Sequence, residues 1–149
     1  MKLKTKTEKE TKELAKKVAE NIISKDKNKA TVLALKGDLG SGKTTFSKGF
    51  AEYFGVERVT SPTFVIMKIY DIDKSGFKKL YHFDCYRLEK EGLGEIKMDE
   101  IINDNKNIVL IEWPEKIKED IKDSLELNFK VVQEKKREIE IPDEIGLKK

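Results

Sequence analysis

Several residue types are scarce in this chain of 149 residues, and each scarcity excludes a class of protein. The single cysteine, Cys85, excludes an internal disulfide and any zinc site built from cysteines, and it is typical of a reducing compartment. Only three arginines are present, Arg58, Arg87 and Arg137. Their small number weakens any function that depends on bidentate contacts to phosphates or bases.

Long apolar runs are also missing. No run approaches 18 residues, and the first ten residues, MKLKTKTEKE, lack the apolar core of a signal peptide. Charged residues make up 40% of the chain but leave a net charge of only +3, which predicts a solvated surface and not a nucleic-acid groove. We therefore expect a soluble, cytoplasmic protein with no membrane segment. Without repeats or flexible linkers, residues 1–149 are predicted to form a single domain.

The first part of the chain has the pattern of a helix that begins at a capping box. Thr7 is the expected N-cap, and Glu10 has the spacing to reach back to it. Behind them Leu14, Val18 and Ile22 form an apolar stripe, which predicts a helix that ends at about residue 24.

The rest of the chain alternates between strand-like and helix-like segments. Short continuous apolar runs predict two central strands, a helix follows the first of them, and two further pairs of strands form hairpins. The strands are expected at residues 30–35 and 108–111, the helix at 43–54, the hairpins at 63–83 and 124–141, and a weak helix at 89–102. This order predicts an α/β fold in which helices flank a central sheet of mixed parallel and antiparallel strands.

The segment with the most specific chemistry is 37–44, GDLGSGKT, which fits G-x-x-x-x-G-K-[ST] at every fixed position. Its glycines let backbone N–H groups turn around a phosphate, and the helix that follows adds its N-terminal partial charge. Lys43 is expected at the β- and γ-phosphates, and the Thr44 hydroxyl at magnesium. The motif predicts a P-loop nucleotide site formed by Asp38, Leu39, Gly40, Ser41, Gly42, Lys43, Thr44 and Thr45.

A P-loop NTPase also needs a carboxylate at the end of a neighbouring strand, where it holds magnesium directly or through water. Two residues satisfy this requirement. Glu112 follows the run IVLI and is the better match, whereas Asp84 follows LYHF, which is less apolar. For each of them the simpler alternative is a carboxylate that only marks where a strand reaches solvent.

Three other features have simpler explanations than catalysis or metal binding. Residues 71–76 copy the first half of a calcium loop, but His82 stands where a bidentate glutamate is required, so a hairpin turn is expected. His82 itself is predicted to be a packed or partly exposed strand residue and not a catalytic base. Trp113 is either a core residue or a wall beside the nucleotide.

Four segments in this order resemble one family. They are GDLGSGKTTF at 37–46, TSPTF at 60–64, YHFDCYRL at 81–88 and IEWPE at 111–115. Together they closely resemble the TsaE (YjeE) family, the small bacterial ATPases needed for the threonylcarbamoyladenosine modification of tRNA. The resemblance covers a core of about residues 7–141, and HFDxYRL and EWPE are far more specific than the P-loop alone.

The resemblance implies a P-loop ATPase fold with ATP as the nucleotide. It implies Mg2+ held at Thr44 and Glu112, and a requirement for Asp84 in hydrolysis. Lys43, Asp84 and Glu112 are accordingly the expected catalytic residues, with Lys43 at the phosphates.

The resemblance also implies roles outside the P-loop. Residues 60–63 take the place of a switch segment near the γ-phosphate. Thr7 and Thr11 fall where the family's N-terminal Ser/Thr residues approach the adenine, although a helix cap explains Thr7 equally well. The implied partners are the TsaD and TsaB proteins, which carry out the transfer to tRNA, so tRNA is engaged only indirectly. The C-terminal hairpin, with Arg137, matches only loosely and receives no role.

Three other functions are compatible with a P-loop. A small-molecule or nucleotide kinase needs several arginines from a lid, and this chain has three in total. A GTPase needs Asn-Lys-x-Asp, and the nearest match, at 105–108, ends in isoleucine. The third alternative is a binding module that is controlled by its nucleotide state and turns over little ATP, and the sequence does not exclude it. Turnover measured with and without partners separates the module from an ATPase.

Overall fold

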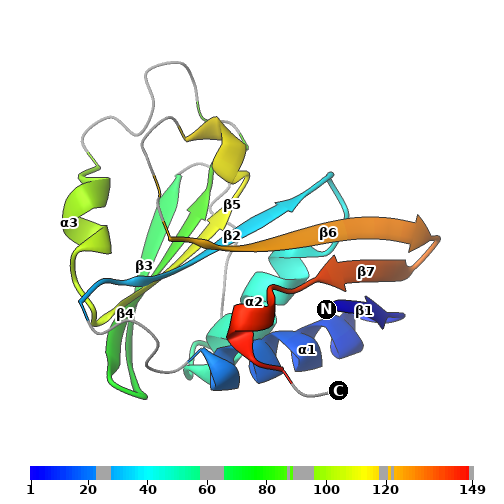
Figure 1. Cartoon of the computed structure of the whole chain (residues 1–149), viewed down its shortest axis with the longest axis horizontal. Helices are drawn as coiled ribbons and strands as arrows, with labels where there is room; N and C mark the ends of the chain where they lie inside the picture. The colour runs from blue at the N-terminus through cyan, green and yellow to red at the C-terminus, as the bar shows by residue number, and fades with distance from the viewer. Residues whose placement is uncertain are drawn as a thin grey trace.

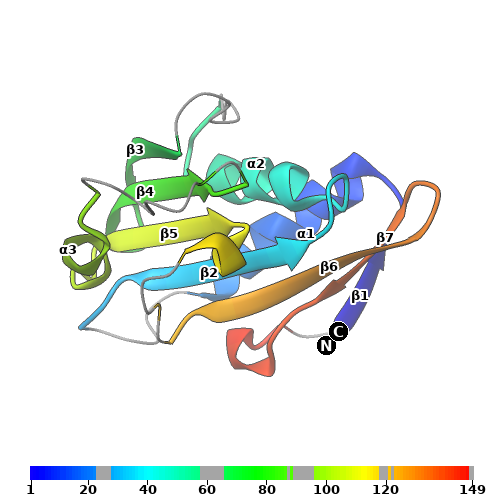
Figure 2. The ribbon, with the colours of Figure 1, turned by 90° about the horizontal axis from the view of Figure 1, so that it is seen from above.

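The computed structural model describes residues 1–22, 28–57, 66–86, 88, 96–117, 121 and 123–147. Within these residues the chain forms an α/β fold with one mixed, seven-stranded sheet and helices on both faces (Figures 1 and 2). The predicted fold class is therefore confirmed. The expected switch segment 60–63, and residues 89–95 of the weak helix, lie outside the described residues.

The sheet has the order β1-β7-β6-β2-β5-β4-β3. Its strands are β1 (Lys2–Thr5), β2 (Thr31–Gly37), β3 (Met67–Lys74), β4 (Phe77–Asp84), β5 (Asn107–Glu112), β6 (Leu125–Gln133) and β7 (Lys136–Glu140). Neighbouring strands among β4, β5, β2 and β6 pair in parallel, whereas β3, β7 and β1 pair antiparallel with their neighbours. The carboxyl ends of the four parallel strands therefore lie at one edge of the sheet.

Helices α1 (Glu8–Asn21) and α2 (Lys43–Tyr53) cover one face (Figure 1). Helix α3 (Met98–Ile102) and the short 3-10 helix η1 (Pro114–Lys116) lie against the other, and a second 3-10 helix, η2 (Asp143–Ile145), follows β7. Apolar side chains fill the space between the sheet and the helices on each face. The core under α1 and α2 includes Leu14, Val18, Leu33, Phe46, Phe50 and Leu110. The core on the opposite face includes Val32, Phe83, Met98, Val109, Ile111 and Ile117.

Helix α1 begins as predicted at Thr7, whose hydroxyl accepts a hydrogen bond from the Glu10 backbone N–H at 3.1 Å. The Glu10 carboxylate reaches back to the N–H of Lys6, one residue before the expected partner. The helix then packs closely on α2 at Gly49. A Cβ atom at Gly49 would lie 2.6 Å from the Cα of Lys12, so only glycine permits this approach.

Two details differ from the sequence predictions. The sequence analysis predicted no strand before residue 7, but β1 precedes helix α1 and pairs with β7, with Leu3 opposite Ile139. The alternating sequence KLKT carries one apolar residue, so β1 depends on its partner strand and not on its own pattern. The turn between β3 and β4 is also shorter than residues 71–76, because Ser75 and Gly76 alone form it with positive φ angles of 59° and 86°. Within the described residues, no helix combines the length and the apolar character needed to cross a membrane.

Candidate nucleotide site

The loop between β2 and α2 has the backbone geometry of an anion cradle. Gly42 is the N-cap of α2 with a φ of 104°, a conformation that favours glycine. At Gly37 a Cβ atom would lie 2.6 Å from the Phe129 carbonyl oxygen and 2.7 Å from the Ser41 Oγ. Glycine is therefore required at both ends of the loop. The Ser41 Oγ is buried and has no hydrogen-bond partner among the described residues, so the cradle holds an unused polar atom.

Lys43 is a buried cation inside this loop. Its side chain is 5% exposed, and its ammonium donates hydrogen bonds to the carbonyl oxygens of Gly37 and Asp38. The Nζ atom also lies 3.8 Å above the centre of the Trp113 ring. Burial lowers the pKa of the Lys43 ammonium below its ordinary value, although nearby carboxylates, Glu112 above all, act in the opposite direction. A bound triphosphate would give this desolvated charge a stronger anionic partner.

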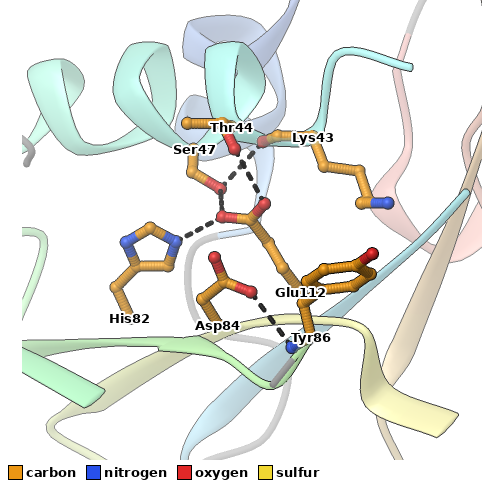
Figure 3. Close-up of polar contacts among 7 residues, drawn as sticks. All are labelled: Lys43, Thr44, Ser47, His82, Asp84, Tyr86 and Glu112. Atoms are coloured by element: carbon orange, nitrogen blue, oxygen red, sulfur yellow. Dashed lines mark hydrogen bonds and ion pairs between the residues drawn. The ribbon is translucent and has the colours of Figure 1, made fainter. Parts of the chain in front are cut away.

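Glu112 ends β5 and lies in the middle of a polar cluster (Figure 3). Its side chain is about as buried as a core residue, at 2% exposure. The Oε1 atom accepts a hydrogen bond from the Thr44 hydroxyl at 3.0 Å. The Oε2 atom lies 2.6 Å from the Nε2 of His82 and accepts a longer bond of 3.4 Å from the Ser47 hydroxyl. Glu112 is thus held from α2 on one side and from β4 on the other.

Asp84, the second candidate carboxylate, ends the neighbouring strand β4. It is directly opposite Glu112 in the parallel register of β4 and β5, and it is half-buried. Its Oδ1 accepts a hydrogen bond from the Tyr86 backbone N–H at 3.2 Å (Figure 3). The structure therefore brings both candidates to the same edge of the sheet, next to the P-loop.

The sequence interpretation missed two residues that contact Glu112, Ser47 and His82. His82 is packed, as predicted, with 1% exposure, but it contacts Glu112 directly. The strand pattern gives only the face on which His82 lies, because residues two apart in a strand face the same side. His82 precedes Asp84 by two residues and therefore shares its face.

Trp113 packs on the core and also contacts the P-loop lysine. It is half-buried against the core on the α3 face and also lies beside the Lys43 ammonium. Its backbone has a positive φ of 62°, and its ring centre lies 4.9 Å from that of Tyr86. The indole is thus in contact with the P-loop lysine on one side and with a half-exposed aromatic ring on the other.

The two N-terminal threonines lie in different surroundings. Thr7 is exposed, and its hydroxyl caps helix α1 by accepting the hydrogen bond from the Glu10 backbone N–H. Thr11 is 3% exposed, and its hydroxyl shares a 2.7 Å hydrogen bond with the hydroxyl of Thr5. It also lies against the P-loop, because its Cγ2 atom is 3.9 Å from the place that a Cβ atom added at Gly42 would occupy. The structure therefore places Thr11 beside the loop and shows Thr7 in its capping position.

The remaining loop residues differ in exposure. Asp38, Leu39 and Gly40 are exposed, and Thr45 is half-buried on the first turn of α2. Arg137, on β7, donates a hydrogen bond to the Gly40 carbonyl oxygen at 3.1 Å. The C-terminal hairpin, which received no role from the sequence, therefore contacts the loop directly.

The oxygen atoms at this site are those that Mg2+ prefers. Thr44 and Glu112 present a hydroxyl and a carboxylate within 3.0 Å of each other, next to the loop. Among the described residues there is no group of three or more His, Cys, Asp or Glu side chains that could hold a metal ion. This small donor set fits a Mg2+ ion that takes its other ligands from nucleotide phosphates and water.

Comparisons with known proteins agree with this geometry. The sequence profile of the family described as "Threonylcarbamoyl adenosine biosynthesis protein TsaE" matches residues 5–139. The chain is 40% identical over 141 residues to the tRNA threonylcarbamoyladenosine biosynthesis protein TsaE of Bacillus subtilis, covering 93% of this chain and 83% of that protein. It is 38% identical over 134 residues to the protein of the same name from Rickettsia felis, covering 87% and 72%.

A solved structure is also similar over nearly the whole chain. The crystal structure of YdiB from Bacillus subtilis superposes with a TM-score of 0.68 and 31% sequence identity, covering 98% of this chain and 88% of that one. The match in sequence, the match in fold and the residues gathered at the carboxyl edge of the sheet agree with one another. This chain belongs to the TsaE family, a family of P-loop NTPase fold involved in tRNA threonylcarbamoyladenosine biosynthesis.

Proposed function

We propose that the chain is a Mg2+-dependent ATPase that supports threonylcarbamoylation of adenosine in tRNA by acting on a TsaB–TsaD transferase complex. The observation that carries this proposal is the convergence of Lys43, Thr44 and Glu112 at the carboxyl edge of the parallel strands. Family membership supplies the pathway. We also propose that the chain acts as a single domain in the cytoplasm, where tRNA is modified.

In this proposal the loop and Lys43 bind the triphosphate. The backbone N–H groups of residues 38–45 surround the phosphates, and the Lys43 ammonium binds the β- and γ-phosphates. Thr44 and Glu112 would hold Mg2+, whose chemistry when bound is to neutralise charge between those phosphates. Thr11 lies beside the P-loop, where we propose that the adenine binds. Thr7 contributes to this adenine site by capping helix α1, which carries Thr11.

Asp84 acts at the reacting end of the nucleotide. It lies opposite Glu112, is only half-buried, and has a carboxylate oxygen that the Tyr86 N–H does not occupy. We assign it the orientation of the attacking water or of the metal's water ligands. ATP binding therefore survives its loss, whereas hydrolysis does not.

The arginine supply favours coupling to a partner over transfer to a small acceptor. Of the three arginines, Arg137 is the one within the described residues. Its Nε donates a hydrogen bond to the Gly40 carbonyl oxygen in the loop. A phosphotransferase needs several free arginines around the transferring group. The near-balanced charge also supports indirect engagement of tRNA, through TsaD and TsaB.

The test is tRNA modification under multiple-turnover conditions with purified TsaB and TsaD. The expected result is slow ATP hydrolysis by the chain alone, faster hydrolysis with both proteins, and repeated threonylcarbamoylation that depends on Lys43, Asp84 and Glu112. Equal modification with the Lys43→Ala variant, or accumulation of a phosphorylated small molecule, would contradict the proposal.

A further inference from the structure

The contact between His82 and Glu112 is unusual for the interior of a sheet. The two side chains are 1% and 2% exposed, and the Nε2···Oε2 distance is 2.6 Å (Figure 3). The sheet neighbours of His82 are Leu80 before it on β4, Leu110 opposite it on β5 and Lys68 opposite it on β3. Leu80 and Leu110 belong to the apolar core, and a leucine at position 82 would extend that core at no desolvation cost. Packing alone therefore does not explain a histidine there.

The two oxygens of the Glu112 carboxylate have different neighbours. Oε2 is taken by His82 and, at longer distance, by Ser47, whereas Oε1 is directed to the Thr44 hydroxyl. Because an ionised carboxylate only accepts, the His82 Nε2 carries the proton of this hydrogen bond. The bond therefore fixes both the rotation of the carboxylate and the oxygen that faces Thr44.

We propose that His82 is a positioning residue that holds Glu112 with Oε1 toward Thr44, where the proposed function places Mg2+. This inference rests on that proposed function. Side chains that orient a metal-binding carboxylate act in this way in many metal sites, and their loss weakens metal affinity about 10- to 100-fold. In this proposal His82 is not a base itself, because its ring is buried and its Nε2 is engaged by Glu112.

The test compares substitutions that keep or remove the donor at Nε2. His82→Gln places an amide N–H where Nε2 lies, whereas Asn is too short and Leu has no donor. Tyr70→Phe is the matched control. It removes another buried polar group from this sheet, the Tyr70 hydroxyl, which has no hydrogen-bond partner among the described residues.

The measurement is nucleotide binding by calorimetry, titrated with Mg2+ and repeated in EDTA. We expect His82→Leu and His82→Asn to need about tenfold more Mg2+ for half-maximal binding, with unchanged affinity in EDTA. His82→Gln and Tyr70→Phe keep the original Mg2+ requirement. If His82→Leu does not fold, the comparison of Gln with Asn decides the question.

A spectroscopic measurement tests the hydrogen bond without nucleotide. Since His82 is the only histidine, its ring gives a single set of signals in long-range proton–nitrogen NMR correlation. We expect the tautomer protonated at Nε2, and a change of its Nε2 signal in Glu112→Gln.

The outcomes separate the two proposals. An unchanged Mg2+ requirement in His82→Leu, or equal losses in the Gln and Asn variants, would overturn the positioning role and leave the ATPase proposal standing. Nucleotide binding by the unsubstituted chain that is independent of Mg2+ would overturn the proposed function, and the positioning role with it.

Discussion

The two ends of the central sheet differ in what they bury. At the carboxyl end, four buried polar or charged side chains, Lys43, Ser47, His82 and Glu112, lie within one cluster. At the amino end is a cavity of about 270 Å3. Its apolar lining consists of Ile22, Ala30, Val32, Ile102, Leu125 and Ile145, and Thr31 and three charged residues complete it.

The difference indicates that the amino end of the sheet contributes mainly to stability and that the carboxyl end is suited to chemistry. Apolar surface removed from water stabilises the fold, whereas buried ionisable groups cost free energy unless they are paired. The carboxyl end retains such groups and leaves the Ser41 hydroxyl without a partner among the described residues. In open α/β sheets, ligands bind outside the carboxyl ends of the strands, so the costly groups lie where a bound ligand would compensate them.

The largest effect is expected from Lys43→Ala, which removes the buried cation from the carboxyl end. ATP affinity should fall about 100-fold, equivalent to about two charge-assisted hydrogen bonds of roughly 1.5 kcal/mol each. Hydrolysis should become undetectable, while the fold is retained because a poorly compensated buried charge is lost. Calorimetry and circular dichroism check both parts, and unchanged affinity in a folded variant would refute the P-loop assignment.

The next effect separates the two carboxylates at that end. Glu112→Gln and Asp84→Asn should each reduce ATP hydrolysis about 100-fold, the size expected when one electrostatic contact to the transition state is lost. Their binding behaviour should differ. Glu112→Gln should weaken the Mg2+ dependence of ATP binding, whereas Asp84→Asn should bind Mg2+ and ATP normally. Hydrolysis at the original rate in Asp84→Asn would assign that residue a structural role only.

A smaller effect is expected at the amino end from Ala30→Val. The residue is buried and lines the cavity, so two added methyl groups have space to fill. The free energy of unfolding should rise by about 1 kcal/mol, from about 0.8 kcal/mol per buried methylene reduced by some strain. ATP affinity should not change. A chemical denaturation curve combined with calorimetry measures both, and weaker ATP binding would show that the two ends are coupled.

The smallest effect is optical. Trp113 is the only tryptophan and lies against the Lys43 ammonium, so nucleotide binding should change its fluorescence intensity and emission maximum. The Lys43→Ala variant is the control, since its spectrum should already differ before nucleotide is added. A spectrum that stays constant at saturating ATP would mean that the indole contributes only to packing.

The sequence predicted the parts of the site that are local in the chain. The P-loop lies within eight consecutive residues, and the strand that ends at Glu112 is marked by its apolar run, so both followed from spacing. Helix α1 and its cap were predicted for the same reason.

Contacts between distant segments could not be predicted in this way. The hydrogen bond from His82 to Glu112 depends on the parallel register of β4 and β5, which no local pattern encodes. The bond from Arg137 to Gly40 depends on the placement of β6 and β7 beside β2. Strand β1 is stabilised by its pairing with β7, so its short sequence carried no signal.

The proposed Mg2+–ATP site is tested by a calorimetric titration of the unsubstituted chain with ATP, once with Mg2+ and once with EDTA. We predict a single site that binds ATP more tightly with Mg2+, because Thr44 and Glu112 lie together at the loop where we propose that the phosphates bind. No binding, or equal affinity in Mg2+ and in EDTA, would contradict the assignment of the carboxyl end as a Mg2+–ATP site.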